Sequence, residues 1–375
     1  MSCDPLSGRL RVLICGLAMV MMSIIVGAPI VAVPTITSRP VQIRAASTFT
    51  FAILENGRVF AWGRNTEGQL GLGDTRTRDT PVLIPALFGV RDIACCGNTV
   101  FALCEDGNLV AWGDNADGLV DPGILENLSS PVPYPAITGI ARLLSSGDHC
   151  LALREDGRLY AWGRNASGQL GLGYAGTTEP VPRPVPGLSQ VREIAVTREA
   201  SFALLSDGSV CSWGSNLYGE LGQGDAGSGT ARYVPTPVPG LTGIRVLTGG
   251  QRHVLAIGEG AGGESEPVLY GWGSDSHGQT GTDPTGTLGI VTHPSPVPVP
   301  EVPTTLVAAG NASMGILPDG SVLVWGTNTG NVLGTGEPTG TIYRVPTPHP
   351  ALSCVAGATL TLQTGFAIRE DGSIY

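Results

Sequence analysis

The sequence predicts an all-β protein built from a repeated unit of about 50 residues, and three observations lead to this fold class. Of the 375 residues, 55 are glycine, 29 are proline and 42% are hydrophobic, which favours many short strands joined by turns around a buried core. A Trp-Gly pair recurs at intervals of 50–59 residues. An Asn-Gly or Asp-Gly dipeptide precedes most of these pairs by six residues. The six repeat tryptophans are Trp62, Trp112, Trp162, Trp213, Trp272 and Trp325.

Each unit is expected to contain four strands. The stretch FAILENGRVFAWG at 51–63 reads as two alternating strands around a two-residue turn, where Asn56-Gly57 supplies the positive φ that a tight hairpin needs. Three residues after each tryptophan, an amide or carboxylate side chain can hydrogen-bond its own backbone. The glycines of GQLGLG at 68–73 and 168–173 then permit a sharp reversal. The fixing residues are Asn65, Asn115, Asn165, Asn216, Asp275 and Asn328.

Four strands per unit are typical of a propeller blade, whereas solenoid repeats are shorter. We therefore assign residues 34–375 to a β-propeller. The stretch ALREDGRLYAWGRNASGQLGLG at 152–173 resembles the repeat of the regulator of chromosome condensation family. That resemblance implies seven blades. Because IREDGSIY at 368–375 matches the middle of a repeat, we expect the seventh repeat to be incomplete. Either the chain is a fragment, or SRPVQIRAAS near residue 40 helps to close the ring.

Residues 1–33 are expected to be a signal peptide or a signal anchor. Arg9 and Arg11 precede the uncharged stretch 12–33, which has the length and polarity of an export signal and could also span a bilayer. Either role would take the propeller across a membrane. We expect a secreted protein, or a membrane-anchored one that faces outside.

Composition excludes several classes of function. All 21 basic residues are arginine, so the lysine of P-loop NTPases, protein kinases and pyridoxal enzymes is missing. A net charge of −10 with scattered arginines argues against binding to nucleic acid. The five histidines lack metal spacing and no G-x-S-x-G motif occurs, so we expect no catalytic, cofactor or metal-binding residues. His149 and His253 are expected to be turn residues bonded to the backbone.

The cysteines leave two alternatives open. Cys95 or Cys96 precedes a short turn and Cys104 follows it, so a local disulfide would be feasible in an exported protein. The alternative, which we favour, is that these residues are small buried hydrophobes in strands.

Departures from the repeat indicate where a partner could bind. The fifth repeat lengthens its hairpin with GEGAGGESEP at 258–267, and the second replaces GQLGLG with GLVDPG at 118–123. We expect Glu259, Glu264, Glu266 and Tyr270 to contact a partner. The alternative is a solvated insertion.

The family resemblance implies several possible functions, because members of that family include a nucleotide exchange factor for the small GTPase Ran, an ultraviolet photoreceptor and a secreted β-lactamase inhibitor. A monomeric, non-enzymatic binding or scaffold propeller fits the export signal best. Its partner would be a protein or a glycan outside the cytoplasm, and its contact with membrane would be limited to an N-terminal anchor. The alternatives are a guanine-nucleotide exchange factor for a small GTPase and a propeller lyase or hydrolase with an unrecognised site.

Overall fold

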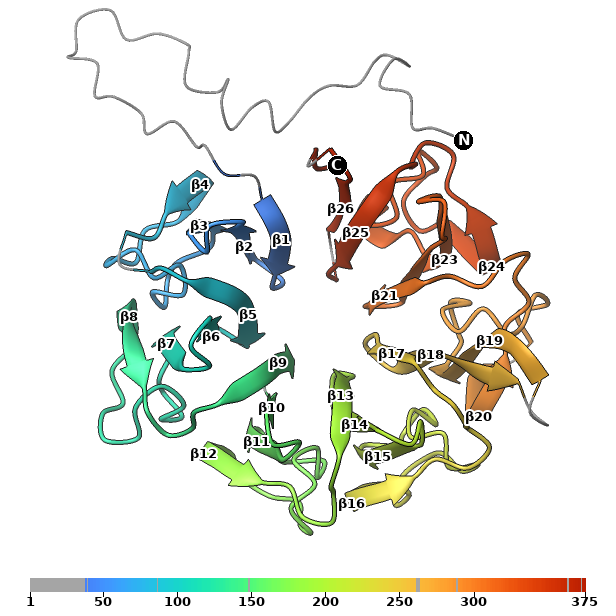
Figure 1. Ribbon diagram of the computed structural model, residues 1–375, viewed down its shortest axis with the longest axis horizontal. Coiled ribbons are helices and arrows are strands. Elements are labelled where there is room, and N and C mark those ends of the chain that lie inside the picture. Colours follow the sequence, from blue (N-terminus) through green and yellow to red (C-terminus); the bar gives the residue numbers. More distant parts are fainter. Residues whose placement is uncertain are drawn as a thin grey trace, which may run out of the picture.

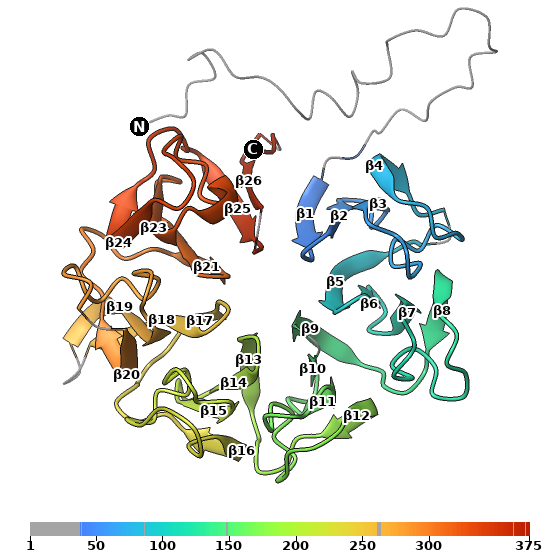
Figure 2. The ribbon, with the colours of Figure 1, turned by 180° about the vertical axis from the view of Figure 1, so that it is seen from behind.

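The chain folds into a β-propeller whose sheets surround a central axis (Figures 1 and 2). The computed structural model describes residues 38, 40–85, 87–147, 149–260, 264–287, 289–362, 364–371 and 373–375. Six sheets have four strands each, and a seventh has two. The all-β prediction is therefore confirmed. The described residues form six complete blades rather than seven, and the seventh repeat contributes only part of a blade.

Every blade runs outward from the axis, with its strands paired in sequence order and antiparallel. Blades 1 to 3 consist of β1 (Pro40–Ala45), β2 (Phe49–Leu54), β3 (Val59–Gly63), β4 (Arg78–Leu83), β5 (Val90–Cys96), β6 (Thr99–Cys104), β7 (Leu109–Gly113), β8 (Leu128–Tyr134), β9 (Ile140–Ser146), β10 (His149–Arg154), β11 (Leu159–Gly163) and β12 (Glu179–Pro184). Blades 4 to 6 consist of β13 (Val191–Val196), β14 (Ala200–Leu205), β15 (Val210–Gly214), β16 (Arg232–Pro237), β17 (Val246–Gly249), β18 (His253–Gly260), β19 (Glu264–Ser274), β20 (Ile290–Pro296), β21 (Thr305–Ala309), β22 (Ala312–Ile316), β23 (Val322–Thr327) and β24 (Ile342–Pro348). The seventh sheet pairs β25 (Val355–Leu360) with β26 (Gly365–Arg369), and the one helical element among the described residues is the short 3-10 helix η1 (Thr329–Asn331).

The predicted hairpins form where the turn dipeptides stand. In blade 1 the connection covers residues 55–58, so it has four residues rather than the predicted two. The Gly57 N–H donates to the Leu54 carbonyl (2.8 Å), and Gly57 has a φ of +69°. A side chain there would be strained, because a Cβ at Gly57 would lie 2.8 Å from the Gly89 Cα of the next blade.

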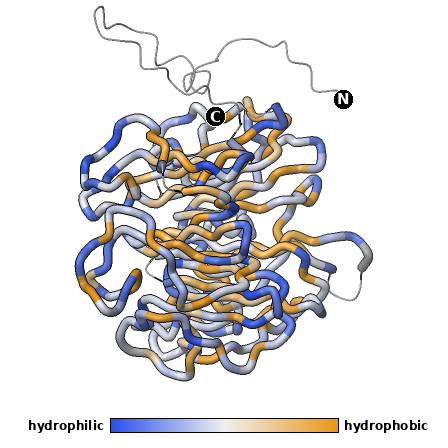
Figure 3. Tube along the Cα trace, turned by 60° about the vertical axis from the view of Figure 1, so that its left-hand side comes forward, coloured by the Kyte–Doolittle hydropathy of each residue, from blue (hydrophilic) through white to orange (hydrophobic). Residues whose placement is uncertain are grey.

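The core lies in the seams between neighbouring blades rather than inside any one blade. Seven clusters of buried residues each combine side chains from two adjacent sheets. In Figure 3 the hydrophobic stretches run along the strands, while hydrophilic stretches are common in the loops at their ends. The seventh sheet packs on blade 1 through Ile374 and Ile43. The segment near residue 40, considered above as a closing piece for the last blade, is instead the innermost strand of blade 1.

The antiparallel order gives the propeller two distinct faces. We call the loops between the third and fourth strands of each blade the Gly loops. They share one end of the sheets, the loop face, with the turns between the first and second strands. The Asn-Gly and Asp-Gly hairpin tips lie at the opposite end, the hairpin face. The strand order therefore separates the two kinds of turn onto opposite faces.

The predicted export signal at 1–33 lies outside the described residues. Among the residues described, no helix is long and apolar enough to cross a bilayer.

Candidate functional site

Five of the six Gly loops are held by the asparagine predicted to fix them. In blade 1, the Asn65 Oδ1 accepts a hydrogen bond from the Leu70 N–H (2.8 Å), and its Nδ2 donates to the Asp74 carbonyl (2.8 Å). The equivalent asparagines hold the carbonyl nine residues ahead in the same way. These side chains are almost completely buried, so the loops are rigid platforms on the propeller. The holding asparagines of the other blades are Asn115, Asn165, Asn216 and Asn328.

Blade 5 departs from this arrangement because Asp275 stands where the other blades have asparagine. Its Oδ1 accepts from the Thr280 N–H (2.9 Å), but its buried Oδ2 has no hydrogen-bond partner among the described residues. Burial raises the pKa of the Asp275 carboxyl above its usual range. An ionised carboxylate cannot donate, so the second bond of the other loops is missing here.

Three of the repeat tryptophans, Trp112, Trp213 and Trp272, tie their blade to the one before it by a hydrogen bond. The buried Nε1 atoms of Trp162 and Trp325 have no partner among the described residues. The Nε1 of Trp112 donates to the Gln69 carbonyl (2.8 Å), and that of Trp213 donates to the Gln169 carbonyl (2.9 Å). These bonds reach from one blade into the Gly loop of the preceding blade. Five of the six tryptophans are fully buried, whereas Trp62, which faces the two-stranded seventh sheet, is partly exposed.

The predicted turn histidines bond to side chains rather than only to backbone. The Nε2 of His149 lies 2.9 Å from the Oγ of Ser201, and that of His253 lies 2.8 Å from the Oγ of Ser313. Each serine belongs to the following blade. Because Ser201 Oγ donates to the Gln169 carbonyl (2.8 Å), we assign the His149 Nε2 as the donor to Ser201. Burial lowers the pKa of His149 to about 4 and that of His253 to about 3, so both rings are neutral ties between blades at neutral pH.

The loop face carries most of the exposed apolar side chains. Nine of the twelve large apolar residues that are exposed in the described chain lie in Gly loops, at the starts of fourth strands or in the β25–β26 turn. A concentration of this kind on one face is typical of an interaction surface. The nine are Ile124, Leu125, Tyr174, Leu217, Tyr233, Val234, Ile290, Ile342 and Leu362.

The Gly loop of blade 2, residues 114–127, is the most unusual part of this face. Leu125 is 67% exposed, the highest value among these apolar side chains, and Ile124 beside it is 42% exposed. Asn115 donates to the Ile124 carbonyl (2.7 Å), which fixes the backbone that presents both side chains. The loop contains four acidic residues and no basic one. The loop therefore presents two exposed apolar side chains on a fixed backbone, surrounded by negatively charged side chains.

The lengthened hairpin of blade 5 is present, but one predicted contact residue is not available to a partner. Strands β18 and β19 have 8 and 11 residues, and the hairpin extends outward from the rim (Figures 1 and 2). Tyr270 is only 4% exposed, and its hydroxyl donates to the Glu259 carbonyl (2.8 Å). Its predicted place in a contact surface is wrong, because it braces the hairpin. Glu266 is exposed and Glu259 partly so, with the Glu259 carboxylate 3.8 Å from Arg245. The Glu264 side chain lies outside the description.

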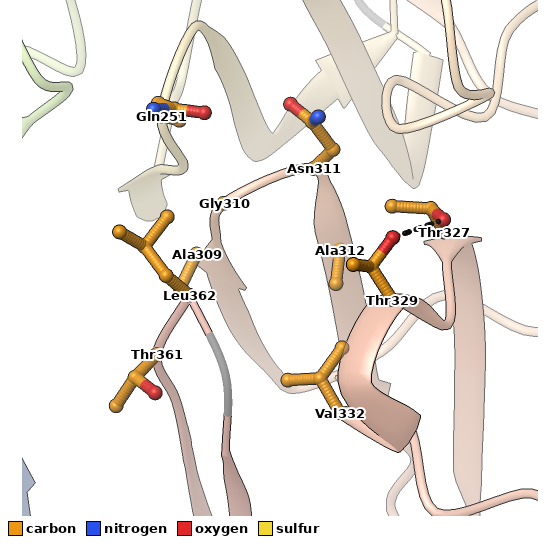
Figure 4. Close-up of a pocket in the computed structure, with 10 residues that line it drawn as sticks. All are labelled: Gln251, Ala309, Gly310, Asn311, Ala312, Thr327, Thr329, Val332, Thr361 and Leu362. Atoms are coloured by element: carbon orange, nitrogen blue, oxygen red, sulfur yellow. Dashed lines mark hydrogen bonds between the residues drawn. The ribbon is translucent and has the colours of Figure 1, made fainter. Parts of the chain in front are cut away.

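The loop face also has a small hollow between blades 5, 6 and 7 (Figure 4). Its volume is about 100 Å³, and Gln251, Asn311, Thr327 and Leu362 are among the residues that line it. Pockets that enclose drug-sized ligands measure ~300–1,000 Å³, so this hollow could take only a few waters or the tip of one side chain. Among the described residues, no group of three or more His, Cys, Asp or Glu side chains could hold a metal ion.

The local disulfide considered for the second repeat is not formed. Cys95, Cys96 and Cys104 are free thiols. Cys96 is buried in the seam with blade 3, as expected for a small hydrophobe.

Comparison with known proteins identifies the repeat. The family model described as RCC1-like domain matches residues 27–287. The chain belongs to the RCC1-like domain family. It is similar to the mitochondrial RCC1 domain-containing protein RUG3 of Arabidopsis thaliana, with 31% identity over 129 residues, or 34% of this chain and 26% of that protein. It is also similar to the ultraviolet-B receptor UVR8 of the same plant, with 30% identity over 187 residues, or 47% of this chain and 38% of the receptor.

Solved structures support the fold of this RCC1-like chain. Prp20p of Saccharomyces cerevisiae, solved with a study of its binding to Gsp1p and histones, superposes with a TM-score of 0.71 at 24% identity, covering 88% of this chain and 83% of that one. This likeness concerns the fold alone. The chain spans less than two fifths of the length of the two curated relatives, so their activities are not carried over by the match.

Proposed function

We propose that this RCC1-like chain is a non-enzymatic binding propeller that holds a protein partner on its loop face, outside the cytoplasm. The observation that carries the proposal is the gathering of nine exposed apolar side chains on one face of a rigid repeat frame. Burial of such side chains against a partner supplies the favourable free energy of association. The outside setting rests on the uncharged stretch 12–33 after Arg9 and Arg11. A glycan is the second kind of partner that the exposed tyrosines would suit.

The partner-binding test compares two apolar side chains that lie on opposite faces and are both more than half exposed. Leu125 is 67% exposed on the loop face, and Phe88 is 59% exposed beside the hairpin tip of blade 1. The immobilised full chain would be cross-linked to proteins of the host's extracellular fraction. We expect Leu125→Ser to reduce recovery of the specific partner at least tenfold, as for a central interface residue, while Phe88→Ser leaves it unchanged. Equal recovery with both variants would remove the loop face from the proposal.

The blade 5 hairpin is tested in the same experiment. A variant with alanine at Glu259, Glu264 and Glu266 should lose binding only if the hairpin contributes to the contact. Unchanged recovery would assign this hairpin to a solvated insertion. The outside setting is tested separately, because the intact mass of the protein in medium, membrane and cytoplasm shows both its location and any cleavage near residue 33.

Nucleotide exchange on a small GTPase is the alternative, and one comparison motivates it: Prp20p, which shares this fold, is described together with its binding to Gsp1p. Release of a fluorescent guanine nucleotide from purified small GTPases of the host would be measured with and without the chain. Acceleration that depends on the chain would favour the alternative over a purely scaffolding role.

A further inference from the structure

One position of the repeat faces the preceding blade across each seam. It is the second residue of strand β14 in blade 4, where Ser201 receives the hydrogen bond from His149 of blade 3. In blade 6 the second residue of β22 is Ser313, which His253 of blade 5 contacts in the same way. In blade 3 this position, the second residue of β10, is Cys150. The repeat geometry therefore directs the Cys150 thiol toward blade 2.

The end of β5 in blade 2 lies directly against this part of blade 3. The Ser145 Oγ donates to the Cys95 carbonyl (2.8 Å), and the Gly97 N–H donates to the Gly147 carbonyl (2.7 Å). These two bonds bracket Cys96. Consecutive strand residues point to opposite sides, and the two cysteines follow this rule: Cys95 packs with the core between blades 1 and 2, whereas Cys96 belongs to the core between blades 2 and 3.

The two thiols meet in this seam. Cys150 stands opposite Ser145 in the β9–β10 register, which places it beside the bracketed Cys96. Both side chains belong to one core cluster, with 3% of Cys96 and none of Cys150 exposed. The two thiol side chains interact directly across the seam. Neither the structural role of the repeat nor the proposed binding face requires a pair of thiols here, since the other sheets have threonine, valine, serine or phenylalanine at the Cys150 position.

We propose that Cys96 and Cys150 are a redox pair that closes into a disulfide between blades 2 and 3. The oxidant is a low-molecular-weight disulfide. One thiol loses its proton and attacks a sulfur of that disulfide, forming a mixed disulfide and releasing the first small thiol. The second cysteine, as thiolate, then attacks the sulfur of the first and releases the second small thiol. The two cysteines lose two protons and two electrons, and the small disulfide is reduced to two thiols.

The environment sets the rate of this closure. Burial raises the pKa of the Cys150 thiol well above its usual range, and thiolate is the reactive form. Exchange therefore waits for transient opening of the seam between blades 2 and 3. Once closed, the bond ties together residues 54 positions apart in the sequence, which restricts the unfolded chain and raises the melting temperature by about 5 °C.

The experiment incubates the full chain with oxidised glutathione, with and without urea below its unfolding midpoint, and then blocks free thiols by alkylation. Trypsin cuts after Arg91, Arg142 and Arg154 and leaves no site between them. A bridge would therefore join peptide 92–142 to peptide 143–154, and it would disappear on reduction. We expect this cross-linked pair, a mass about 2 Da lower than that of the reduced chain when both are measured before alkylation, and the higher melting temperature.

Variants assign the bridge to its cysteines. Cys150→Ser reproduces the residue found at this position in blades 4 and 6, so it should fold, and it should abolish the bridge. Cys96→Ser should abolish it as well. Cys95→Ser and Cys104→Ser alter the same tryptic peptide and should leave the bridge intact. A bridge that survives Cys96→Ser, a bridge that is lost in Cys95→Ser, or a wild-type chain that stays reduced in both urea conditions would overturn the proposal.

Discussion

Replacing Asp275 by asparagine should stabilise the propeller. In the other five complete blades an asparagine at this position both accepts and donates within its Gly loop, whereas the Asp275 carboxylate only accepts. Its Oδ2 is buried without a partner among the described residues. The Asp275→Asn variant changes no heavy-atom count and restores a donor toward the carbonyl of residue 284, nine positions ahead, which is the acceptor position used by the other loops.

The size of the gain follows from the missing hydrogen bond. A buried polar atom without a partner costs roughly 1–3 kcal/mol, so we expect Asp275→Asn to raise the free energy of unfolding by about 2 kcal/mol at neutral pH. Unfolding entropy of ~2.1 cal/mol/K per residue over about 330 ordered residues gives ~0.7 kcal/mol/K. The melting temperature should therefore rise by about 3 °C.

The pH dependence of the gain in stability shows whether it comes from removing the unpaired Asp275 carboxylate. Burial raises the pKa of Asp275 in the folded chain, so the folded carboxyl binds its proton more tightly than the unfolded one, whose pKa is ~3.9. The wild-type penalty is absent below ~3.9, grows as the pH rises through the folded pKa, and is complete above it. The gain of Asp275→Asn should accordingly shrink as the pH falls toward 4. Calorimetry at several pH values measures it, and a variant that melts no higher than wild type at pH 7 would refute this account of the loop.

Three further predictions concern the ties between blades. The pKa of His149 is about 4 in the folded chain and ~6.5 when unfolded, so lowering the pH from 6.5 to 4 should reduce the free energy of unfolding by ~3 kcal/mol through this residue. Urea titrations should therefore show a flatter dependence of stability on pH for His149→Thr than for wild type, and the exposed His293→Thr serves as the control. A Cβ at Gly171 would lie 2.7 Å from the Trp213 Nε1, whereas Gly187 has a similar positive φ and no atom within 4 Å, so Gly171→Ala should lose about 2 kcal/mol more than Gly187→Ala in chemical denaturation. Glu220 stands where other repeats have glutamine, and burial raises its pKa because it disfavours the charged carboxylate. Glu220→Gln should therefore raise the melting temperature at neutral pH, and a lower melting temperature would contradict a desolvation cost at this position.

Local patterns in the sequence predicted the parts of the fold that are local. Spacing within one repeat predicts the alternating strands around Asn56-Gly57 and the loop-holding role of Asn65, and both are found. Contacts that join side chains of two different repeats were not predicted. The link from His149 to Ser201 joins residues 52 positions apart. The sequence does contain a signal for this link. In two places the repeat that follows a histidine has a serine one position after the equivalent of that histidine: His149 with Ser201, and His253 with Ser313.

The candidate site was harder to predict for a related reason. Tyr270 looked available because it flanks an acidic, glycine-rich insertion, yet whether a strand residue faces a seam or the solvent depends on the neighbouring blade. The apolar side chains of the loop face come from six different repeats, and no single repeat contains enough of them to stand out. Only the closure of the sheets around one axis brings them to a common surface.

The tryptophan ties have a direction, and this direction bears on how the ring assembles. In blades 2, 4 and 5 the tie runs from the tryptophan back to the Gly loop of the preceding blade. A preceding blade that has just folded therefore presents a free backbone carbonyl and a glycine surface to the next repeat. A ribosome or a translocation channel delivers the repeats in that same order. The second to sixth repeats therefore each arrive with a tryptophan that packs against the preceding blade. Such an order suits a chain whose contacts are mostly between sequence neighbours, since each step closes a loop of only about 50 residues.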